Sequence, residues 1–375
     1  MKPIYLDNAA STPLMEEVKI AMIEAMNECF ANSSSIHTPG VQAIKKVEKA
    51  RHSIANSLNA SPEEFYFTSG GTESNNWVLK SAVMNRDLKR KKIVTSAIEH
   101  PSIMAPLKWV QENFGIEVLK VGVDASGKIK LAELAQVLNE DVFLCTLMHV
   151  NNEVGSVQPI EEVSRLCARH AIPLHVDACQ SFIKLPLDLR MVELTYLTIN
   201  AHKLHGPKGI GALYMRKGHE LPPLMLGGGH EMNFRSGTLN VPAIIGFGKA
   251  VALQQKMPEQ IHEMSQQLKW LGDELKNNYS HCRINGSEVD RAPHILNVHF
   301  KGNLGKDIFW ALNKAGIAVS TSSACSSNKM TPSHVLAAMG MEDEANLEAL
   351  RISIGLQTKR EDLEILIHEL KGIIK

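Results

Sequence analysis

Short apolar runs alternate with longer stretches of helical spacing over the first two-thirds of the chain. The apolar runs read as strands and occupy residues 65–68, 93–96, 117–121, 142–149, 173–176, 195–199 and 210–215. Between them, the spacing of apolar residues predicts helices at 73–88, 102–114, 130–138 and 159–170. Strands that alternate with helices form a mostly parallel sheet with helices on both faces, so we predict an α/β fold.

The pattern changes late in the chain, which indicates more than one domain. A chain of 375 residues with 44% hydrophobic content can bury more than one core. A long helical stretch follows Pro242 and leads into a Gln- and Lys-rich region at 254–280, after which the predicted elements become shorter. We place the domain change there. Residues 15–30 also show helical spacing, and we interpret their methionine-containing stripe, which includes Met26, as core.

Charge and targeting signals exclude several classes of function. The 40 basic and 40 acidic side chains cancel, so no general field favours nucleic acid or an anionic membrane. The first residues lack the apolar core of a signal peptide, and no stretch is apolar enough to span a bilayer. We therefore expect a cytoplasmic protein with neither nucleic acid nor membrane as a direct partner.

Cysteine and histidine spacing argues against a metal site. The six cysteines are scattered without a Cys-x-x-Cys pair, which fits neither a zinc site nor a disulfide framework. Among the 16 histidines, His202 and His205 form one close pair, but no third ligand follows at a useful spacing. We expect no bound metal and reduced thiols.

Lys203 follows an apolar run and enters a Gly-Pro loop, a placement that suits a reactive amine. An amine attacks an aldehyde only when it is unprotonated, and nearby cations or partial burial lower its pKa toward that state. His202, His205 and Lys208 are neighbours in sequence that supply such cations. A surface lysine in a polar turn explains the same residues.

Asp177 ends another apolar run, and Gln180 follows three positions later. Ligands of open α/β sheets bind beyond the carboxyl ends of strands, so a carboxylate there faces a site. The ring of pyridoxal phosphate accepts electrons as long as its nitrogen is protonated, and a paired carboxylate keeps that nitrogen protonated. An amide can form a hydrogen bond with the phenolic oxygen of the ring. The alternative is an aspartate that caps the next helix.

Residues 65–76 predict a strand, a glycine turn and the start of a helix. Gly70 and Gly71 let the backbone close on a phosphate at the helix start, where Thr72 adds a hydroxyl donor. The alternative is a helix-capping turn that binds no ligand, which the same residues would also form, and the P-loop pattern is absent.

Cys325 is the cysteine whose neighbours least resemble a core, because it stands among small polar residues at 319–329. Such surroundings leave a thiol free to reach and attack, whereas apolar packing makes it inert. A stray surface thiol is the alternative.

These segments together resemble the cysteine desulfurases of the class V aminotransferase group, over nearly the whole chain. The matching segments are Tyr-Leu-Asp-Asn-Ala-Ala-Ser-Thr-Pro near the start, Ser-Gly-Gly-Thr-Glu-Ser-Asn-Asn, Glu99-His100-Pro101, Asn151-Asn152-Glu153-Val154-Gly155, 177–180, His202-Lys203, Arg235-Ser-Gly-Thr238, Ser323-Ala-Cys325-Ser and Arg351-Ile-Ser-Ile-Gly. The resemblance implies fold type I of the enzymes that depend on pyridoxal 5′-phosphate. It also implies a large domain at 16–254 and a small α+β domain formed by 1–15 with 255–375.

The resemblance implies roles in cofactor binding. Lys203 would hold pyridoxal 5′-phosphate as a Schiff base and shuttle protons, while His100 would stack on the ring and help in proton transfer. Asp177 and Gln180 would bind the ring as argued above. The remaining cofactor contacts would come from Gly71, Thr72, Asn152, Asn200, His202 and, from the second subunit of a homodimer, Thr238.

The resemblance also implies the reaction. Arg351, with Asn32 and Asn152, would grip the carboxylate of L-cysteine through a guanidinium fork. Cys325 would take the substrate sulfur as a persulfide, leave L-alanine, and pass the sulfur to an acceptor protein for iron–sulfur cluster assembly or thio-modification. Two alternatives stay open, another enzyme of the group such as a selenocysteine lyase or an aminotransferase, and a non-catalytic scaffold.

Three positions depart from the pattern of this family. Asn200 stands where a serine or threonine usually helps to bind the phosphate, which puts one phosphate contact in doubt. Ser33 follows Asn32 where a proline is common. Cys179 replaces a common alanine, and we interpret it as a thiol buried beside the cofactor rather than a second nucleophile.

Overall fold

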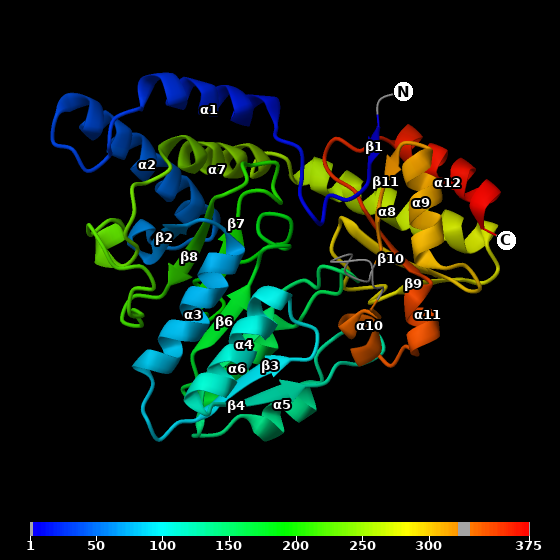
Figure 1. Cartoon of the computed structure of the whole chain (residues 1–375), viewed down its shortest axis with the longest axis horizontal. Coiled ribbons are helices and arrows are strands. Elements are labelled where there is room, and N and C mark those ends of the chain that lie inside the picture. Colours follow the sequence, from blue (N-terminus) through cyan, green and yellow to red (C-terminus); the bar gives the residue numbers. More distant parts are fainter. Residues whose placement is uncertain (1–2, 322–330, 375) are drawn as a thin grey trace.

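The computed structural model describes residues 3–321 and 331–374, and most of the first 254 residues form a layered α/β body (Figure 1). Its seven-stranded sheet has the order β2-β8-β7-β6-β5-β3-β4. The strands are β2 (Phe65–Thr68), β3 (Lys92–Ser96), β4 (Glu117–Val121), β5 (Val142–Met148), β6 (Leu174–Asp177), β7 (Tyr196–Asn200) and β8 (Gly211–Met215). Only β8 runs antiparallel to its neighbours, so the predicted mostly parallel sheet is confirmed.

Helices cover both faces of this sheet, which explains why its strands read as continuous apolar runs. One face packs against α2 (Thr38–Ser57), α5 (Leu131–Val137), α6 (Ile160–Arg169) and α7 (Val241–Gln254). The other face packs against α3 (Gly71–Asn85) and α4 (Pro101–Phe114). Helix α1 (Glu16–Glu28) lies outside these helices and packs on α7. Short 3₁₀ helices occupy Pro62–Glu64 and Glu231–Asn233.

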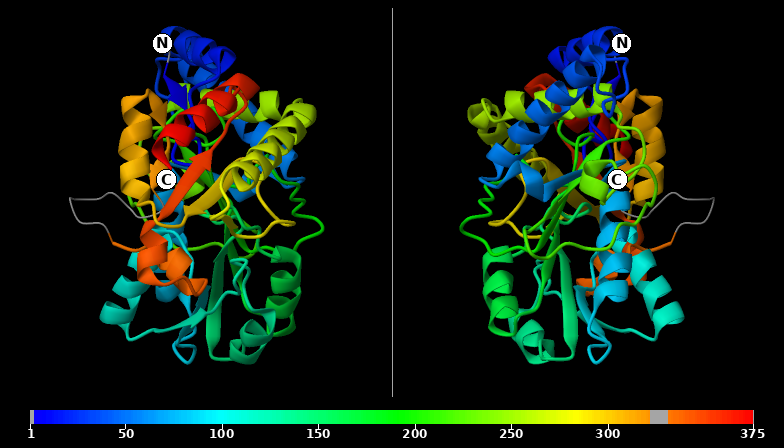
Figure 2. Two further views of the ribbon diagram at one scale, coloured as in Figure 1. Left: turned by 90° about the vertical axis from the view of Figure 1, so that its right-hand side faces the viewer. Right: turned by 90° about the vertical axis from the view of Figure 1, so that its left-hand side faces the viewer.

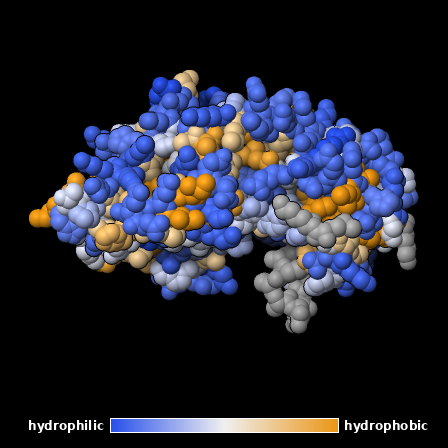
Figure 3. Space-filling model, turned by 90° about the horizontal axis from the view of Figure 1, so that it is seen from above, coloured by the Kyte–Doolittle hydropathy of each residue, from blue (hydrophilic) through white to orange (hydrophobic). Residues whose placement is uncertain are grey.

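The interpretation of the methionine stripe was wrong at one end of α1. Val18 and Ala25 are buried as expected, but Met26 is 56% exposed in the single chain. Phe30, just beyond the helix, is 80% exposed. Figure 3 shows apolar surface at the end of the molecule where α1 and α2 meet. This end of the molecule therefore presents apolar side chains that no part of the described chain covers.

Residues from about 258 onward build a second layered body. Its antiparallel sheet has the order β12-β13-β10-β9, with β9 (Cys282–Asn285), β10 (Ile295–Phe300), β12 (Ser320–Thr321) and β13 (Ala349–Ser353). The helices are α8 (Pro258–Asn278), α9 (Gly305–Lys314), α10 (His334–Ala338), α11 (Asp343–Leu347) and α12 (Arg360–Ile373). Leucine and isoleucine side chains from α8, α9, α12 and the sheet form one buried core.

The N-terminal segment belongs spatially with this second body. Strand β1 (Ile4–Tyr5) pairs in parallel with β11 (Ile317–Ala318), and Leu6 is fully buried in the core of the second body. Figure 2 shows the N-terminal strand beside elements from the other end of the chain. No helix in the described part of the chain is long and apolar enough to cross a membrane.

Candidate active site

The carboxyl ends of β5, β6 and β7 open into a cavity of about 340 Å³ where the two bodies meet. This is the edge at which open α/β sheets bind ligands. Its lining includes ten of the residues predicted from sequence, namely Gly71, Thr72, His100, Asn152, Asp177, Gln180, Asn200, His202, Lys203 and Arg351. These ten residues come from six separate segments of the chain and are thus brought into one cavity.

Three predicted residues are not among those that line the cavity. Asn32 is exposed between α1 and α2, where its Oδ1 accepts a hydrogen bond from the backbone N–H of Ser34 at 3.0 Å. Thr238 is exposed in the segment before α7. Cys325 lies outside the described residues. In the single chain, therefore, neither Asn32 nor Thr238 reaches the cavity.

Lys203 sits three residues beyond β7, at the sheet edge where the cavity opens. Burial lowers the pKa of Lys203, while Asp177 and Cys179 act against this lowering. Arg351, from the second body, also lowers the pKa of Lys203, a contribution that the sequence neighbours did not indicate.

Asp177 is the buried carboxylate at the end of β6. Its Oδ1 accepts from the backbone N–H of Cys179 at 2.9 Å, and its Oδ2 accepts from Asn75 Nδ2 at 2.8 Å. Burial alone would raise the pKa of Asp177, but these hydrogen bonds outweigh burial and lower it. The site therefore holds an ionised carboxylate, as a protonated ring nitrogen requires.

His100 is linked to Asp177 through two polar side chains. It caps α4, because its Nδ1 accepts from the backbone N–H of Ser102 at 3.1 Å. Ser102 Oγ lies 2.8 Å from the same nitrogen and accepts from Asn75 Nδ2 at 2.8 Å. Burial and then Lys203 lower the pKa of His100. We infer a neutral ring with the proton on Nε2, because Nδ1 is used as an acceptor.

The start of α3 offers an anion site at the other end of the cavity. Gly70, which precedes the helix, has a φ of 148°, and no side chain caps the first turn. A Cβ atom at Gly71 would lie 2.5 Å from Cys179 Sγ, so only glycine fits against this buried thiol. Uncapped N–H groups at a helix start are the donors that a phosphate uses.

Asn200 and His202 both line the cavity near the start of α3. Asn200 Oδ1 is buried without a hydrogen-bond partner among the described residues, so the departure from the family pattern leaves a polar group unsatisfied here. Burial, followed by Lys203, lowers the pKa of His202 to about 4, which keeps its ring neutral. Together with the ionised Asp177, these features fit pyridoxal 5′-phosphate.

Arg351 closes the cavity from the second body. It is 8% exposed; its Nη2 donates to Asp7 Oδ1 at 2.7 Å and its Nη1 donates to the backbone carbonyl of Asn152 at 3.0 Å. Its Nε is buried without a partner in the described chain. The guanidinium is thus oriented from two sides and keeps its Nε–H unused as a donor for a carboxylate.

Sequence reasoning gave no role to Asn75, Ser102 or Asp7, although all three hold predicted site residues in place. Asn75 could have been found, because it lies one helical turn after Gly71 and therefore on the same face of α3. Asp7 stands in the Tyr-Leu-Asp-Asn segment near the start of the chain, but its partner Arg351 is 344 residues away. No local pattern indicates such a pair.

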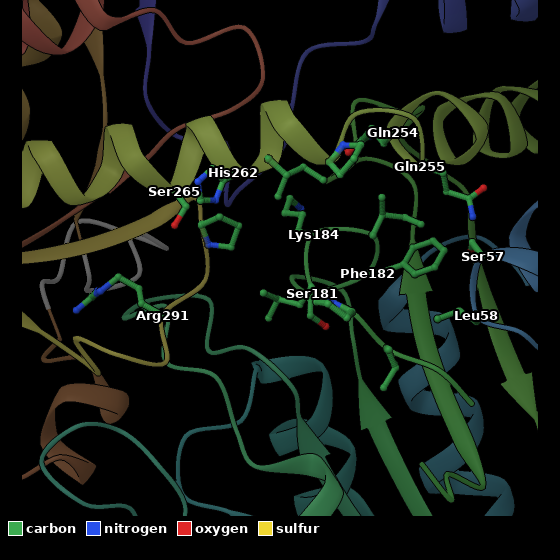
Figure 4. A pocket seen from close by; sticks show the side chains of 17 residues that line it. Ser57, Leu58, Ser181, Phe182, Lys184, Gln254, Gln255, His262, Ser265 and Arg291 are labelled. Atoms are coloured by element: carbon green, nitrogen blue, oxygen red, sulfur yellow. The ribbon is translucent and has the colours of Figure 1, made fainter. Parts of the chain in front are cut away.

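A larger cavity of about 520 Å³ lies beside the loop after β6 and the start of α8 (Figure 4). None of the predicted site residues lines it, and its lining contains Lys184 and Arg291 but no carboxylate. In residues 3–321 and 331–374, no group of three or more His, Cys, Asp or Glu side chains could hold a metal ion. The smaller cavity is therefore the candidate active site.

Comparisons with known proteins find similarity over nearly the whole chain. A family model described as aminotransferase class-V matches residues 4–366. A relative named "Cysteine desulfurase IscS", from Dictyoglomus turgidum (strain DSM 6724 / Z-1310), is 39% identical over 375 residues, which cover 100% of this chain and 95% of the relative.

Two solved structures extend the similarity to three dimensions. A structure named "NIFS-LIKE PROTEIN" has a TM-score of 0.92 at 35% identity and covers 99% of both chains. Another, named "SspA in complex with cysteine", has a TM-score of 0.82 at 35% identity and covers 94% of this chain and 98% of its own.

Proposed function

This chain belongs to the class-V aminotransferase family, and we propose that it is a cysteine desulfurase that depends on pyridoxal 5′-phosphate. It removes sulfur from L-cysteine, releases L-alanine and transfers the sulfur to an acceptor. The observation that carries the proposal is that Lys203, Asp177 and Arg351 line one cavity although they come from both bodies of the fold. The structure that was solved with cysteine supports the choice of substrate.

The residues of the cavity divide into those that would bind the cofactor and those that would bind substrate. Lys203 Nζ is the amine that would bond the cofactor aldehyde, and Asp177 would pair with the ring nitrogen. Gln180 would bond the phenolic oxygen, while His100 would stack on the ring. The start of α3 would receive the phosphate, with Gly71, Thr72, Asn200 and His202 as its neighbours.

When bound, pyridoxal 5′-phosphate withdraws electrons from the carbon atoms of the substrate. Arg351 and Asn152 would hold the substrate carboxylate and so fix the orientation of the substrate Cα–H bond. Lys203 Nζ, whose pKa is lowered by burial so that the free amine forms more readily, would take the proton from Cα and return it in the steps that form alanine. The neutral His100 carries a proton on Nε2 that it can donate within the same cavity.

Cys325 is the proposed acceptor of sulfur, on the sequence argument alone, because it lies outside the described residues. Its thiolate would attack the sulfur of the substrate, so that a new S–S bond forms while the C–S bond breaks. The electron pair of the C–S bond stays on the carbon skeleton, which is then protonated to alanine. A thiol of an acceptor protein, in iron–sulfur cluster assembly or thio-modification, would later take the outer sulfur.

The exposed positions of Asn32 and Thr238 support a homodimer in which Thr238 reaches the cavity of the partner. Met26 and Phe30 supply exposed apolar surface for such an interface. We keep the division into a large domain, 16–254, and a small domain, 1–15 with 255–375, as part of this proposal. Five free thiols among the described residues agree with the reducing cytoplasm.

Two substitutions test the proposal on purified protein. Lys203→Ala should abolish the visible absorbance of covalently bound cofactor, and Lys217→Ala, which changes an exposed lysine, should not. Cys325→Ala should keep that absorbance but release no sulfide from L-cysteine in the presence of a thiol reductant. Cys282→Ala is the matched cysteine control. A wild-type spectrum in Lys203→Ala, or unchanged turnover in Cys325→Ala, would contradict the assigned roles.

A further inference from the structure

The amide of Gln180 is held by two groups that come from outside the large sheet. Its Nε2 donates to the backbone carbonyl of Ala9 at 2.9 Å, and its Oε1 lies 3.1 Å from Nε2 of His294. All three residues are buried. Gln180 itself follows β6, whereas Ala9 comes from the N-terminal segment and His294 immediately precedes β10. The second body therefore determines how this amide is oriented.

The direction of each hydrogen bond follows from donor and acceptor chemistry. A carbonyl oxygen only accepts, so the amide atom beside Ala9 must be the nitrogen of Gln180. The amide oxygen then faces His294, and this oxygen also only accepts, so Nε2 of His294 must carry a proton. Only one hydrogen of Gln180 Nε2 is used by Ala9. Gln180 lines the cavity, so its second amide hydrogen would be the donor available to a ligand there.

His294 is built to act as a fixed, neutral donor. It is 1% exposed, and its backbone carbonyl accepts from the N–H of Ile354 at 3.0 Å, which ties it to the end of β13. Burial lowers the pKa of His294 well below its ordinary value, and the nearby basic groups Lys184, Lys203, Arg351 and His205 act in the same direction. Its Nδ1 is buried without a partner among the described residues. A single hydrogen bond, to Gln180, thus uses its only ring proton.

We propose that His294 is a positioning residue for the desulfurase reaction, which fixes the amide of Gln180 as a donor toward the phenolic oxygen of the cofactor. The inference rests on the proposed function, because it assumes that the cavity holds pyridoxal 5′-phosphate. His294 itself acts only through Gln180. The small domain thereby contributes to the electronics of the cofactor as well as to the binding of substrate through Arg351.

Removal of the His294 donor should leave the amide free to rotate and weaken the bond to the phenolic oxygen. The phenolic oxygen would then keep more negative charge. The proton that it shares with the nitrogen joining Lys203 to the cofactor would be held more tightly. The pH at which the visible absorbance of the bound cofactor changes should rise by about 0.5–1 unit, the shift expected for the loss of one hydrogen bond. Cofactor should also dissociate about 3–10-fold more readily.

Five variants distinguish a role in positioning from a role in packing. His294→Gln places an amide nitrogen near the position of Nε2 and should restore the wild-type titration. His294→Leu fills similar volume without a donor, and His294→Asn carries a donor that is too short to reach. Gln180→Leu alone and combined with His294→Leu completes a double-mutant cycle. The visible titration, cofactor dissociation and melting temperature are measured for each holoenzyme.

The expected pattern is a raised titration midpoint in His294→Leu and His294→Asn, a normal midpoint in His294→Gln, and no further change when His294→Leu is added to Gln180→Leu. Equal midpoints in wild type and His294→Leu, or additive effects in the double variant, would overturn the positioning role. A role in packing alone would lower the melting temperature without a midpoint shift, which also overturns it. Failure of the proposed function itself would appear as wild-type protein without visible absorbance.

Discussion

Gly71 shows how one atom limits which side chain the site accepts. The nearest obstacle to a Cβ atom there is Cys179 Sγ at 2.5 Å, whereas the next, on Thr198, is 3.6 Å away. Gly71→Ala should therefore destabilise the fold by about 1–3 kcal/mol, as overpacking does, and weaken cofactor retention by moving the start of α3. Thermal melting and cofactor release on dialysis measure the two effects.

Cys179→Ala is the matched variant, because it removes the sulfur atom that the new methyl group would meet. The double variant Gly71→Ala with Cys179→Ala should regain most of the stability and most of the cofactor. Cys179→Ala alone should keep its cofactor and its turnover of L-cysteine, since burial raises the pKa of this thiol well above its ordinary value and leaves it unreactive. A double variant no better than Gly71→Ala would show that the obstacle lies elsewhere.

The residues proposed to carry the chemistry could be predicted from sequence more readily than the residues that hold them in place. Lys203 and Asp177 stand at the ends of apolar runs, and this local pattern pointed to the sheet edge where the structure has them. Their supports come from distant positions: Asn75 is 102 residues from Asp177, and Ala9 is 171 residues from Gln180. Such pairs depend on the folded arrangement of both bodies, about which local spacing gives no information.

At the scale of elements, the turn between β3 and α4 places Glu99 in the interior directly before His100. Its Oε1 accepts from Ser96 Oγ at 2.5 Å and from the backbone N–H of Met148 in β5 at 3.1 Å, while its Oε2 has no partner in the described chain. Burial raises the pKa of Glu99 to about 8 from the ordinary 4.5. The carboxyl group is therefore neutral at neutral pH and ties the turn to β5.

This raised pKa predicts a pH-dependent stability. Because the folded chain binds the proton more tightly than the unfolded chain, the stabilisation is complete below about pH 4.5 and is lost as the pH rises to about 8. Glu99→Gln stays neutral at all pH values. Its free energy of unfolding relative to wild type should improve by roughly 2–4 kcal/mol between pH 5 and pH 9.

Urea unfolding of both proteins at the two pH values measures this difference. Glu112→Gln, which changes an exposed residue of α4, is the control and should show no such trend. Equal pH dependence in wild type and Glu99→Gln would mean that Glu99 is ionised in the folded protein.

The elements that sequence predicted well are those whose burial is uniform. Every residue of β5 and of β7 is buried, and their apolar runs were recognised within two residues of the observed bounds. Strands β1, β11 and β12 have two residues each, which is too short for any periodicity, and they were not predicted. Helix α2 was also missed, since its polar residues outweigh its buried stripe of Ala43, Val47 and Ile54.

At the scale of the whole molecule, the two ends of the chain meet around the candidate site. The Asp7–Arg351 ion pair and the Ala9–Gln180 hydrogen bond both join the N-terminal segment to residues far along the chain. If Arg351 binds substrate as proposed, substrate binding would be coupled to the packing of the second body against the first. Thr238 and Asn32 lie outside the single-chain cavity, so their proposed roles would require a second copy of the chain.

A hybrid dimer tests whether Thr238 acts across the interface. Thr238→Ala should lose cofactor affinity about 3–10-fold in its homodimer, the cost of one hydrogen bond, and Lys203→Ala should bind no cofactor covalently. When both chains are coexpressed with different tags and purified as a hybrid, the Lys203→Ala chain lends its intact Thr238 to the site that keeps Lys203. That one site should recover wild-type affinity and turnover. If Thr238 instead serves its own chain, the hybrid keeps the weakened affinity of the Thr238→Ala homodimer, because the only site with Lys203 then lacks the threonine.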